Sequence, residues 1–349
     1  MRNDRKPVSR ILRVGAIVFL GLFMVGGVAQ AKSPIIIFFA DNHWDSILIH
    51  NRVVAYIVSR GMGYQTDFVS GQTTKLYLGL QKGHVDIYME SWTENFQQAY
   101  DKALGSGNVL DLGPNFADSW QGWMVPTYIT RGDSMRGIDP VASDLKSVTD
   151  IAKYWKLFKD PDDPGKGRFY NSVNGLDTTR INEKKLAAYG LNKHFNQFIP
   201  DSVEALSGSL TVAYMFARPW FGYYESPSWV LGRMDMTPLA EPPYDQKVWD
   251  TTKGCAYPSV QVNKLINTQL LKRAPDVVEF LKKYQTTAAI NSKFLAYMHN
   301  AGATTEEAAI WFLKNYELLW TTWVSPKVAI KVRHGLYGIP VDPLELEGK

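Results

Sequence analysis

The chain lacks most of the residues and motifs on which catalysis and covalent crosslinking depend. It has a single cysteine, Cys255, among 349 residues, so an internal disulfide is excluded. Its six histidines have no metal-ligand spacing. The phosphate-binding glycine loop, the zinc-protease motif, the nucleophile elbow and the dinucleotide fingerprint are all absent. We therefore expect a protein without enzymatic activity or cofactor, and leave open only a structural metal at the acidic turn 160–163.

The chain also lacks net charge once its amino-terminal segment is set aside. Residues 1–31 hold five basic residues and one acid, a net charge of +4 that equals the +4 of the whole chain. The remaining residues are therefore balanced in charge. Nothing in this balance indicates nucleic acid or an anionic surface as a partner.

The first 31 residues have the pattern of a cleavable signal peptide. Basic residues precede an apolar run at 14–28, and Ala29-Gln30-Ala31 fits a small-x-small cleavage site. An uncleaved membrane anchor is the alternative, but the run is shorter than the roughly 20 residues that a span needs. Cys255 lies too far from the cleavage site to carry a lipid. We expect a soluble periplasmic protein that begins at residue 32.

Strands and helices alternate through the rest of the chain. Short β-type runs at 35–40, 64–69 and 85–92 alternate with helical stretches, and a second unit of the same kind begins near residue 168. This alternation predicts an α/β fold of two lobes, each a mostly parallel sheet flanked by helices. The expected boundaries are residues 32–128 with 250–349 for the first lobe and 129–249 for the second.

Two tryptophans stand at the ends of two predicted strands of the first lobe. One run leads into Trp44 and Asp45, and the other ends in Glu90 and Trp92. Ligands of open α/β sheets bind at the carboxyl ends of the strands, so we expect these four residues at one site. An indole face attracts a cation by roughly 0.5–2 kcal/mol. Several indoles together suit a methylated ammonium group, which offers no hydrogen-bond donor.

A series of segments, taken in order, resembles the glycine betaine/choline family of ABC-transporter substrate-binding proteins. The segments are Asn42-His43-Trp44-Asp45, Gly63-Tyr64, Gly83 to Asp86, Glu90-Ser91-Trp92, Asp111 to Asn115, Val125 to Tyr128, Lys185 to Leu191, Pro227-Ser228-Trp229 and Cys255 to Pro258. The resemblance covers nearly the whole chain from residue 32. It implies a type II periplasmic binding fold with the ligand between the lobes, and a membrane permease and an ATPase as partners. It also implies that Trp44 and Trp92 belong to an aromatic box around the ammonium group.

The second lobe departs from the pattern of this family. The family often has Trp-x-Pro-x-Trp, whereas this chain has an acid, Glu225, at the place of the first tryptophan. Trp220 or Tyr223 is expected to supply the missing wall, and Trp123 is a further candidate. A charged Glu225 beside the ligand would favour choline over the carboxylate-bearing glycine betaine by about 1–4 kcal/mol. The alternative is that Glu225 points away and is solvated.

The turn before the next helix leads to a similar question. In betaine binders the resemblance implies a glycine-rich helix start that faces the ligand carboxylate, a favourable place for an anion. This chain has Asp177 there. Asp177 either caps the helix or faces the ligand, where it would repel a carboxylate.

Other functions remain as alternatives. Sugars also stack on tryptophan, so the chain could be an exported carbohydrate-binding protein or a carboxylate-dependent hydrolase, which needs two carboxylates at a glycosidase separation. A purely structural envelope protein would explain neither the tryptophans at strand ends nor the two lobes. We predict the solute-binding component of an ABC importer, which captures choline, glycine betaine or a similar compound.

Overall fold

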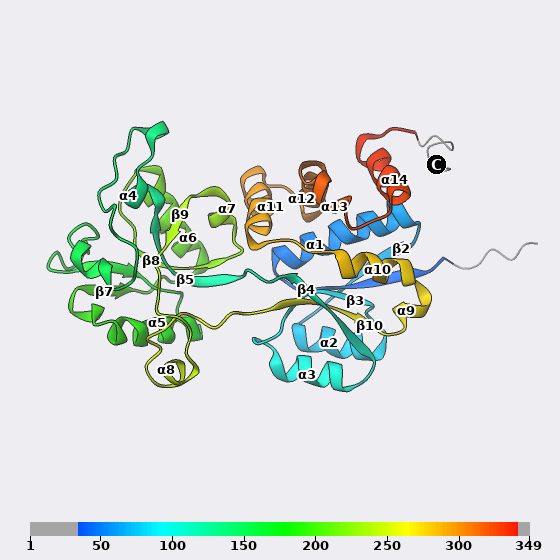
Figure 1. Ribbon diagram of the computed structural model, residues 1–349, viewed down its shortest axis with the longest axis horizontal. Helices are drawn as coiled ribbons and strands as arrows, with labels where there is room; N and C mark the ends of the chain where they lie inside the picture. Colours follow the sequence, from blue (N-terminus) through cyan, green and yellow to red (C-terminus); the bar gives the residue numbers. More distant parts are fainter. Residues whose placement is uncertain (1–33, 341–349) are drawn as a thin grey trace, which may run out of the picture. The chain divides into compact units, whose positions relative to one another are not determined.

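Two separate five-stranded sheets organise the fold (Figure 1). The structure is a computed structural model that describes residues 34–340, so the predicted signal peptide lies outside the described residues. The strand order is β2-β1-β3-β10-β4 in the first sheet and β7-β6-β8-β5-β9 in the second. We use lobe 1 for the first sheet with its helices and lobe 2 for the second sheet with its helices.

In lobe 1, four strands run in one direction and a fifth runs against them. The strands are β1 (Ile36–Asp41), β2 (Gln65–Ser70), β3 (Ile87–Trp92), β4 (Val109–Phe116) and β10 (Val262–Asn267). β1 pairs in parallel with β2 and β3, and β10 is antiparallel to both β3 and β4. The carboxyl ends of β1, β2, β3 and β4 therefore lie at one edge of the sheet.

Helices cover both faces of this sheet (Figure 1). The helices of the amino-terminal part are α1 (Asp45–Tyr56), α2 (Thr73–Lys82) and α3 (Gln97–Gly105). The helices after β10 are α9 (Leu270–Arg273), α10 (Pro275–Lys283), α11 (Ala288–Ala301), α12 (Thr305–Asn315), α13 (Glu317–Trp320) and α14 (Pro326–Tyr337). The capping box expected at Thr304 and Glu307 is confirmed at the start of α12.

Lobe 2 has the same mixture of strand directions. Its strands are β5 (Trp120–Pro126), β6 (Gly167–Tyr170), β7 (Phe195–Phe198), β8 (Gly222–Ser226) and β9 (Met236–Pro238). Its helices are α4 (Thr127–Arg131), α5 (Asp177–Ala188), α6 (Val203–Met215), α7 (Trp229–Arg233) and α8 (Gln246–Thr251). β6 is parallel to β7 and β8, whereas β5 is antiparallel to β8 and β9.

The sheets are thus mixed rather than mostly parallel. The reason is that β10 brings the chain back from lobe 2 and inserts between two strands that run the other way. The chain also first passes from lobe 1 to lobe 2 upstream of the predicted boundary at 128, because β5 already belongs to the second sheet. The chain passes from one sheet to the other within residues 117–119.

Each lobe has its own apolar core. The alternating strand residues Ile37 and Phe39 and the facing α1 residues Val53 and Val54 are fully buried in lobe 1, because one face of β1 lies under α1. In lobe 2, Phe169 and Phe221 of neighbouring strands fill the equivalent place.

Helices α7 of lobe 2 and α11 of lobe 1 pack closely together (Figure 1). Ser228 donates its backbone N–H to the Ser292 hydroxyl at 3.1 Å, and Lys293 donates to the carbonyl of Gly232 at 2.9 Å. The indole of Trp229 stacks on His299 with ring centres 3.7 Å apart. Gly232 permits this approach, because a Cβ there would lie 1.9 Å from the Ser292 carbonyl oxygen.

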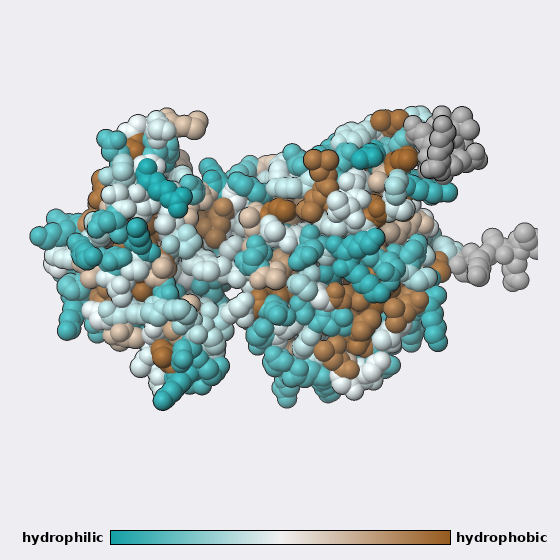
Figure 2. Space-filling view, viewed as in Figure 1, coloured by the Kyte–Doolittle hydropathy of each residue, from teal (hydrophilic) through white to brown (hydrophobic). Residues whose placement is uncertain are grey.

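The outer surface is mostly hydrophilic on the face seen in Figure 2, and apolar areas on that face are concentrated over lobe 1. Exposed apolar side chains of lobe 1 include Leu78, Leu110 and Leu271. Within residues 34–340, no helix combines the length and the hydropathy that crossing a membrane requires.

The contact between α7 and α11 leads to a stability prediction. We expect G232A to lower the free energy of unfolding by about 1–3 kcal/mol, because the new methyl group would overlap backbone atoms of Ser292. The matched control is G208A in helix α6, where a Cβ meets nothing within 4 Å and the better helix propensity should raise stability by about 0.5–1 kcal/mol. Urea unfolding of both variants checks this. Equal effects of the two substitutions would contradict the close packing.

Candidate functional site

Two half-buried indoles lie at the carboxyl edge of the first sheet. Trp44 follows β1 and is the N-cap residue of α1, and Trp92 is the last residue of β3. β1 and β3 are paired, so the two side chains come from adjacent strand ends. The Trp92 ring meets the edge of Phe116, the last residue of β4, with centres 5.9 Å apart. The edge thus presents two partly exposed aromatic rings with an apolar support behind one of them.

Glu90 lies beneath these indoles and is fully buried. Its Oε2 accepts hydrogen bonds from Trp44 Nε1 at 2.7 Å and from Ser46 Oγ at 2.9 Å, and Trp92, two residues later on the same strand, has its side chain on the same side of β3. Burial raises the pKa of Glu90 to about 7, although the side chains of Trp44, Ser46 and Trp92 partly lower it. We expected Glu90 to face a ligand at a wet strand end. The structure covers it with α1 instead, and it contacts the Trp44 indole from inside.

His50 lies on the inner side of Glu90. Its Nε2 is 3.3 Å from Glu90 Oε1, and its Nδ1 is 2.7 Å from the Tyr284 hydroxyl. Burial, together with the charge of Lys264, lowers the pKa of His50 to about 3, so the imidazole is neutral. Burial also raises the pKa of Tyr284 far above its usual value. With Tyr284 donating to Nδ1, the remaining ring proton of His50 faces the carboxyl of Glu90.

The sequence analysis missed the contribution of Ser46 and His50 to this site. A signal for both was present, because they are four residues apart on one helix and therefore share a face. Asp45 was expected at the site and lies beside them in the sequence, but its side chain is exposed at the start of α1. A carboxylate is favourable there because of the helix dipole.

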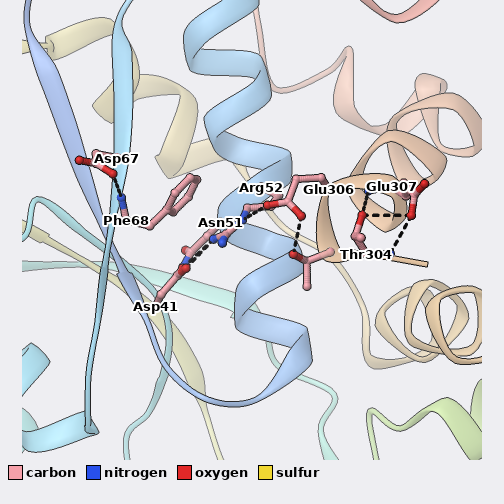
Figure 3. A network of polar contacts seen from close by, with 9 residues as sticks. Asp41, Asn51, Arg52, Asp67, Phe68, Thr304, Glu306 and Glu307 are labelled. Atoms are coloured by element: carbon pink, nitrogen blue, oxygen red, sulfur yellow. Dashed lines mark hydrogen bonds and ion pairs between the residues drawn. The ribbon is translucent and has the colours of Figure 1, made fainter. Parts of the chain in front are cut away.

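A polar network fixes α1 on the end of β1 (Figure 3). Arg52 of α1 donates to Asp41 at the end of β1 at 2.6 Å and to Glu306 of α12 at 2.9 Å. Asn51 also donates to Asp41, at 2.7 Å, and the guanidinium lies 3.7 Å from the ring centre of Phe68. These contacts hold the helix that carries Trp44, Ser46 and His50 in register with the strand.

In lobe 2, Glu225 lies near the carboxyl end of β8, and Tyr223 lies two residues earlier on the same strand. The Tyr223 hydroxyl is 2.9 Å from Gln121 Oε1 and 3.2 Å from Glu225 Oε2. Solvent reaches the Glu225 side chain, yet the surrounding protein atoms raise its pKa, and the hydroxyl of Tyr223 offsets this in part. A side chain that solvent reaches, but that many protein atoms surround, lies on a concave surface. Tyr223 itself is buried, and its polar contacts are made by its hydroxyl.

Trp123 and Trp220, which were expected as possible walls, are part of the lobe 2 core. Trp123 is fully buried and donates Nε1–H to Asn182 at 2.8 Å. Trp220 is buried, stacks on Tyr170 and donates to Ser209 at 3.1 Å. The two rings belong to different buried clusters of lobe 2, so neither has a free face for a ligand, and we do not include them in the proposed site.

Asp177 does not provide the expected cap of α5. It is the first residue of this helix, and the N-cap is Leu176, which makes no side-chain cap. The Asp177 side chain is 92% exposed and lies 3.8 Å from Arg180 of the same helix.

The acidic turn 160–163, for which the sequence left a structural metal as an open possibility, is neutralised by an arginine. Arg168 donates to Asp160 at 2.6 Å and also bonds Asp162. Within the described part of the chain, no group of three or more His, Cys, Asp or Glu side chains could hold a metal ion.

A cavity of about 500 Å³ lies elsewhere, beside α7. Its lining includes Trp120, Met234 and Lys293, and it contains none of the predicted site residues. We therefore place the candidate site at the indoles of lobe 1 and the Glu225 surface of lobe 2.

The raised pKa of Glu90 predicts a pH dependence of stability. Between pH 4.5 and about 7 the unfolded chain has lost the Glu90 proton while the folded protein retains it, so the stability of the wild type falls as the pH rises. The amide in E90Q does not titrate. The free energy of unfolding of E90Q relative to wild type should therefore increase by roughly 3 kcal/mol over this window.

Urea unfolding at pH 4.5, 5.5 and 7 checks this prediction. His50, whose lowered pKa makes stability rise between about pH 3 and 6.5, is common to both proteins, so its own contribution largely cancels in the difference. Parallel stability curves for E90Q and wild type would mean that the carboxyl of Glu90 does not titrate in this range.

Comparison with known proteins supplies the family. Residues 36–315 match the family model described as the substrate-binding domain of the ABC-type glycine betaine transport system, OpuAC. A trimethylamine N-oxide-binding protein of Pelagibacter ubique (strain HTCC1062) is 23% identical over 313 residues, which cover 89% of this chain and 96% of that protein.

Solved structures of similar proteins have the same fold. Lactococcal OpuAC in its closed conformation with glycine betaine has a TM-score of 0.54 at 20% identity and covers 83% of this chain and 100% of its own. An ABC-transporter choline-binding protein in complex with choline has a TM-score of 0.53 at 16% identity, with 86% and 98% covered. These likenesses confirm the predicted α/β, two-lobed fold class.

Proposed function

The chain belongs to the family of substrate-binding domains of ABC-type glycine betaine transport systems, and we propose that it captures a small methylated ammonium or amine N-oxide compound between its lobes. The observation that carries this proposal is the pair of half-buried indoles, Trp44 and Trp92, at the carboxyl edge of the first sheet. Trp44 hydrogen-bonds the buried carboxyl of Glu90, which holds its ring at the edge, and Trp92 follows Glu90 on the same strand.

The chemistry of the ligand follows from what the indoles offer. A quaternary ammonium group has no N–H, so it gains nothing from carbonyls or carboxylates as hydrogen-bond acceptors. An indole face attracts the cation through its quadrupole, by roughly 0.5–2 kcal/mol for each ring. The indole N–H of Trp44 is engaged by Glu90, so the attraction of this indole for the ligand must come from its ring face.

Lobe 2 supplies the selectivity in this proposal. Glu225 lies near a strand end equivalent to that of the indoles, with Tyr223 two residues before it, and closure of the lobes would bring them to the ligand. A charged Glu225 attracts the ammonium group and repels a ligand carboxylate. This favours choline, which has no anionic group, over glycine betaine.

Delivery of the ligand completes the proposed function. We infer a membrane permease and an ATPase as partners, and a periplasmic location with export by the amino-terminal segment, on the basis of the family. A carbohydrate-binding protein or hydrolase remains the rival function. Full burial of Glu90 is against a catalytic role for this carboxyl, because a glycosidase acid must reach its substrate.

The first test of the proposal is ligand binding by tryptophan variants. Calorimetric titration of the protein from residue 32 with choline, trimethylamine N-oxide and glycine betaine should give micromolar binding of at least one compound, about −8 kcal/mol. W44A and W92A should each weaken it by about fivefold or more, because each removes one cation-binding ring face. The control is W311A, a half-buried tryptophan of α12 that stacks on Tyr297.

Unchanged affinity in both W44A and W92A would rule out the aromatic cage. Binding of a neutral sugar in place of every ammonium compound would favour the carbohydrate rival.

A second test concerns the charge of Glu225. E225Q should raise the affinity for glycine betaine relative to choline by roughly tenfold, because it removes the repulsion between two carboxylates. Measuring both ligands on both proteins gives the ratio directly. A ratio that stays the same would mean that Glu225 is solvated and does not face the ligand.

A further inference from the structure

The buried carboxyl of Glu90, beneath the two indoles, also has a role in ligand binding. This inference rests on the proposed function. We propose that Glu90 is a positioning residue of the ligand cage. Its ionised carboxylate fixes Trp44, beside Trp92, through the indole N–H, and capture of a cation by the cage is coupled to release of a proton from Glu90.

The geometry gives Glu90 a hold on the cage. The hydrogen bond from Trp44 Nε1 to the carboxyl is 2.7 Å long, and Trp92 lies two residues after Glu90 on the same strand, with its side chain on the same side. A bond to an ionised acceptor is about twice as strong as a neutral one. Ionisation of Glu90 therefore tightens the hold on the Trp44 indole beside Trp92.

The two carboxyl oxygens have different surroundings. Oε2 accepts from Trp44 and Ser46, whereas Oε1 is buried 3.3 Å from His50 Nε2 without a well-aligned hydrogen bond. A proton on Oε1 would point at His50, which can accept it if its own proton moves to Nδ1. The Tyr284 hydroxyl can then accept from Nδ1 instead of donating, so the His50–Tyr284 pair accommodates both states of Glu90.

Among residues 34–340, no cationic side chain contacts the carboxyl of Glu90 directly. Helix α1 presents neutral His50, and β3 presents the hydroxyl of Tyr88. Tyr284 follows α10, and Lys264 of β10 reaches the carbonyls of Pro114 and Tyr284 rather than the carboxyl. A cationic ligand on the outer faces of the indoles would supply the missing positive charge.

The direction of the coupling follows from this arrangement. A bound cation favours the ionised carboxylate, so the pKa of Glu90 falls from about 7 on binding and a proton is released. Affinity should therefore weaken as the pH falls below 7. We expect an increase in Kd of about five- to tenfold between pH 8 and pH 5.5 in the wild type.

The experiment is a titration of choline into the protein at pH 5.5, 6.5, 7.5 and 8.5, in two buffers with different ionisation enthalpies. The difference in heat between the buffers gives the protons released per ligand. E90Q keeps an acceptor oxygen but cannot ionise, so it should bind more weakly at pH 8, with no proton release and a flat pH profile. E90A lacks the acceptor too and should bind most weakly.

Two control variants separate Glu90 from other carboxylates. E279Q alters an exposed acid of α10 that pairs with Lys282 and should keep the wild-type profile. E225Q removes the lobe 2 carboxyl whose pKa is raised. It should keep the part of the pH dependence of choline affinity that Glu90 causes. A pH dependence that survives in E90Q, or a wild type that binds without releasing protons, would overturn the coupling while the proposed function stands.

Near-ultraviolet circular dichroism of the ligand-free protein tests the positioning role without any ligand. The indole signal of the wild type should titrate with a midpoint near pH 7, and that of E90Q should not. A wild-type signal that does not change near pH 7 would overturn the positioning role. If no ammonium compound binds at all, the proposed function fails, and this spectroscopic result still decides whether Glu90 holds the Trp44 indole.

Discussion

One buried carboxyl, that of Glu90, organises the candidate site. An isolated charge in a protein interior is costly, so such a group is retained only where donors surround it. Here the donors are Ser46 and the indole of Trp44, with His50 on the other side of the carboxyl. The same interaction that makes the burial of Glu90 tolerable therefore fixes the position of Trp44 in the candidate site.

This arrangement depends on the sheet beneath it. β1, β3 and β4 run in the same direction, so Trp44, Trp92 and Phe116 all come to one edge. The ion pairs of Arg52 hold α1 on that edge (Figure 3). Ser46 and His50 of the same helix contact Glu90 of β3. A cage of this kind is preorganised, because the rings are held before a ligand arrives.

In the proposed site the two lobes contribute different groups. Lobe 1 would contribute ring faces and lobe 2 an acid, since the lobe 2 tryptophans Trp123 and Trp220 are buried in its own core. Such a site would combine the quadrupole of the indoles with the formal charge of Glu225. Its selectivity then depends on whether the ligand carries a carboxylate of its own.

The sequence by itself determined the local features. The alternation of strands and helices, the capping box at Thr304, and the placement of Trp44 and Trp92 at strand ends follow from patterns a few residues long. Only the tertiary structure decided which polar and aromatic side chains are covered. Helix α1 covers Glu90, Asn182 contacts Trp123, and Tyr170 contacts Trp220, and each of these partners lies tens of residues away in the chain. Strand β10 makes the first sheet mixed because it returns from the other lobe. Burial is the sum of such long-range contacts, and no local pattern records it.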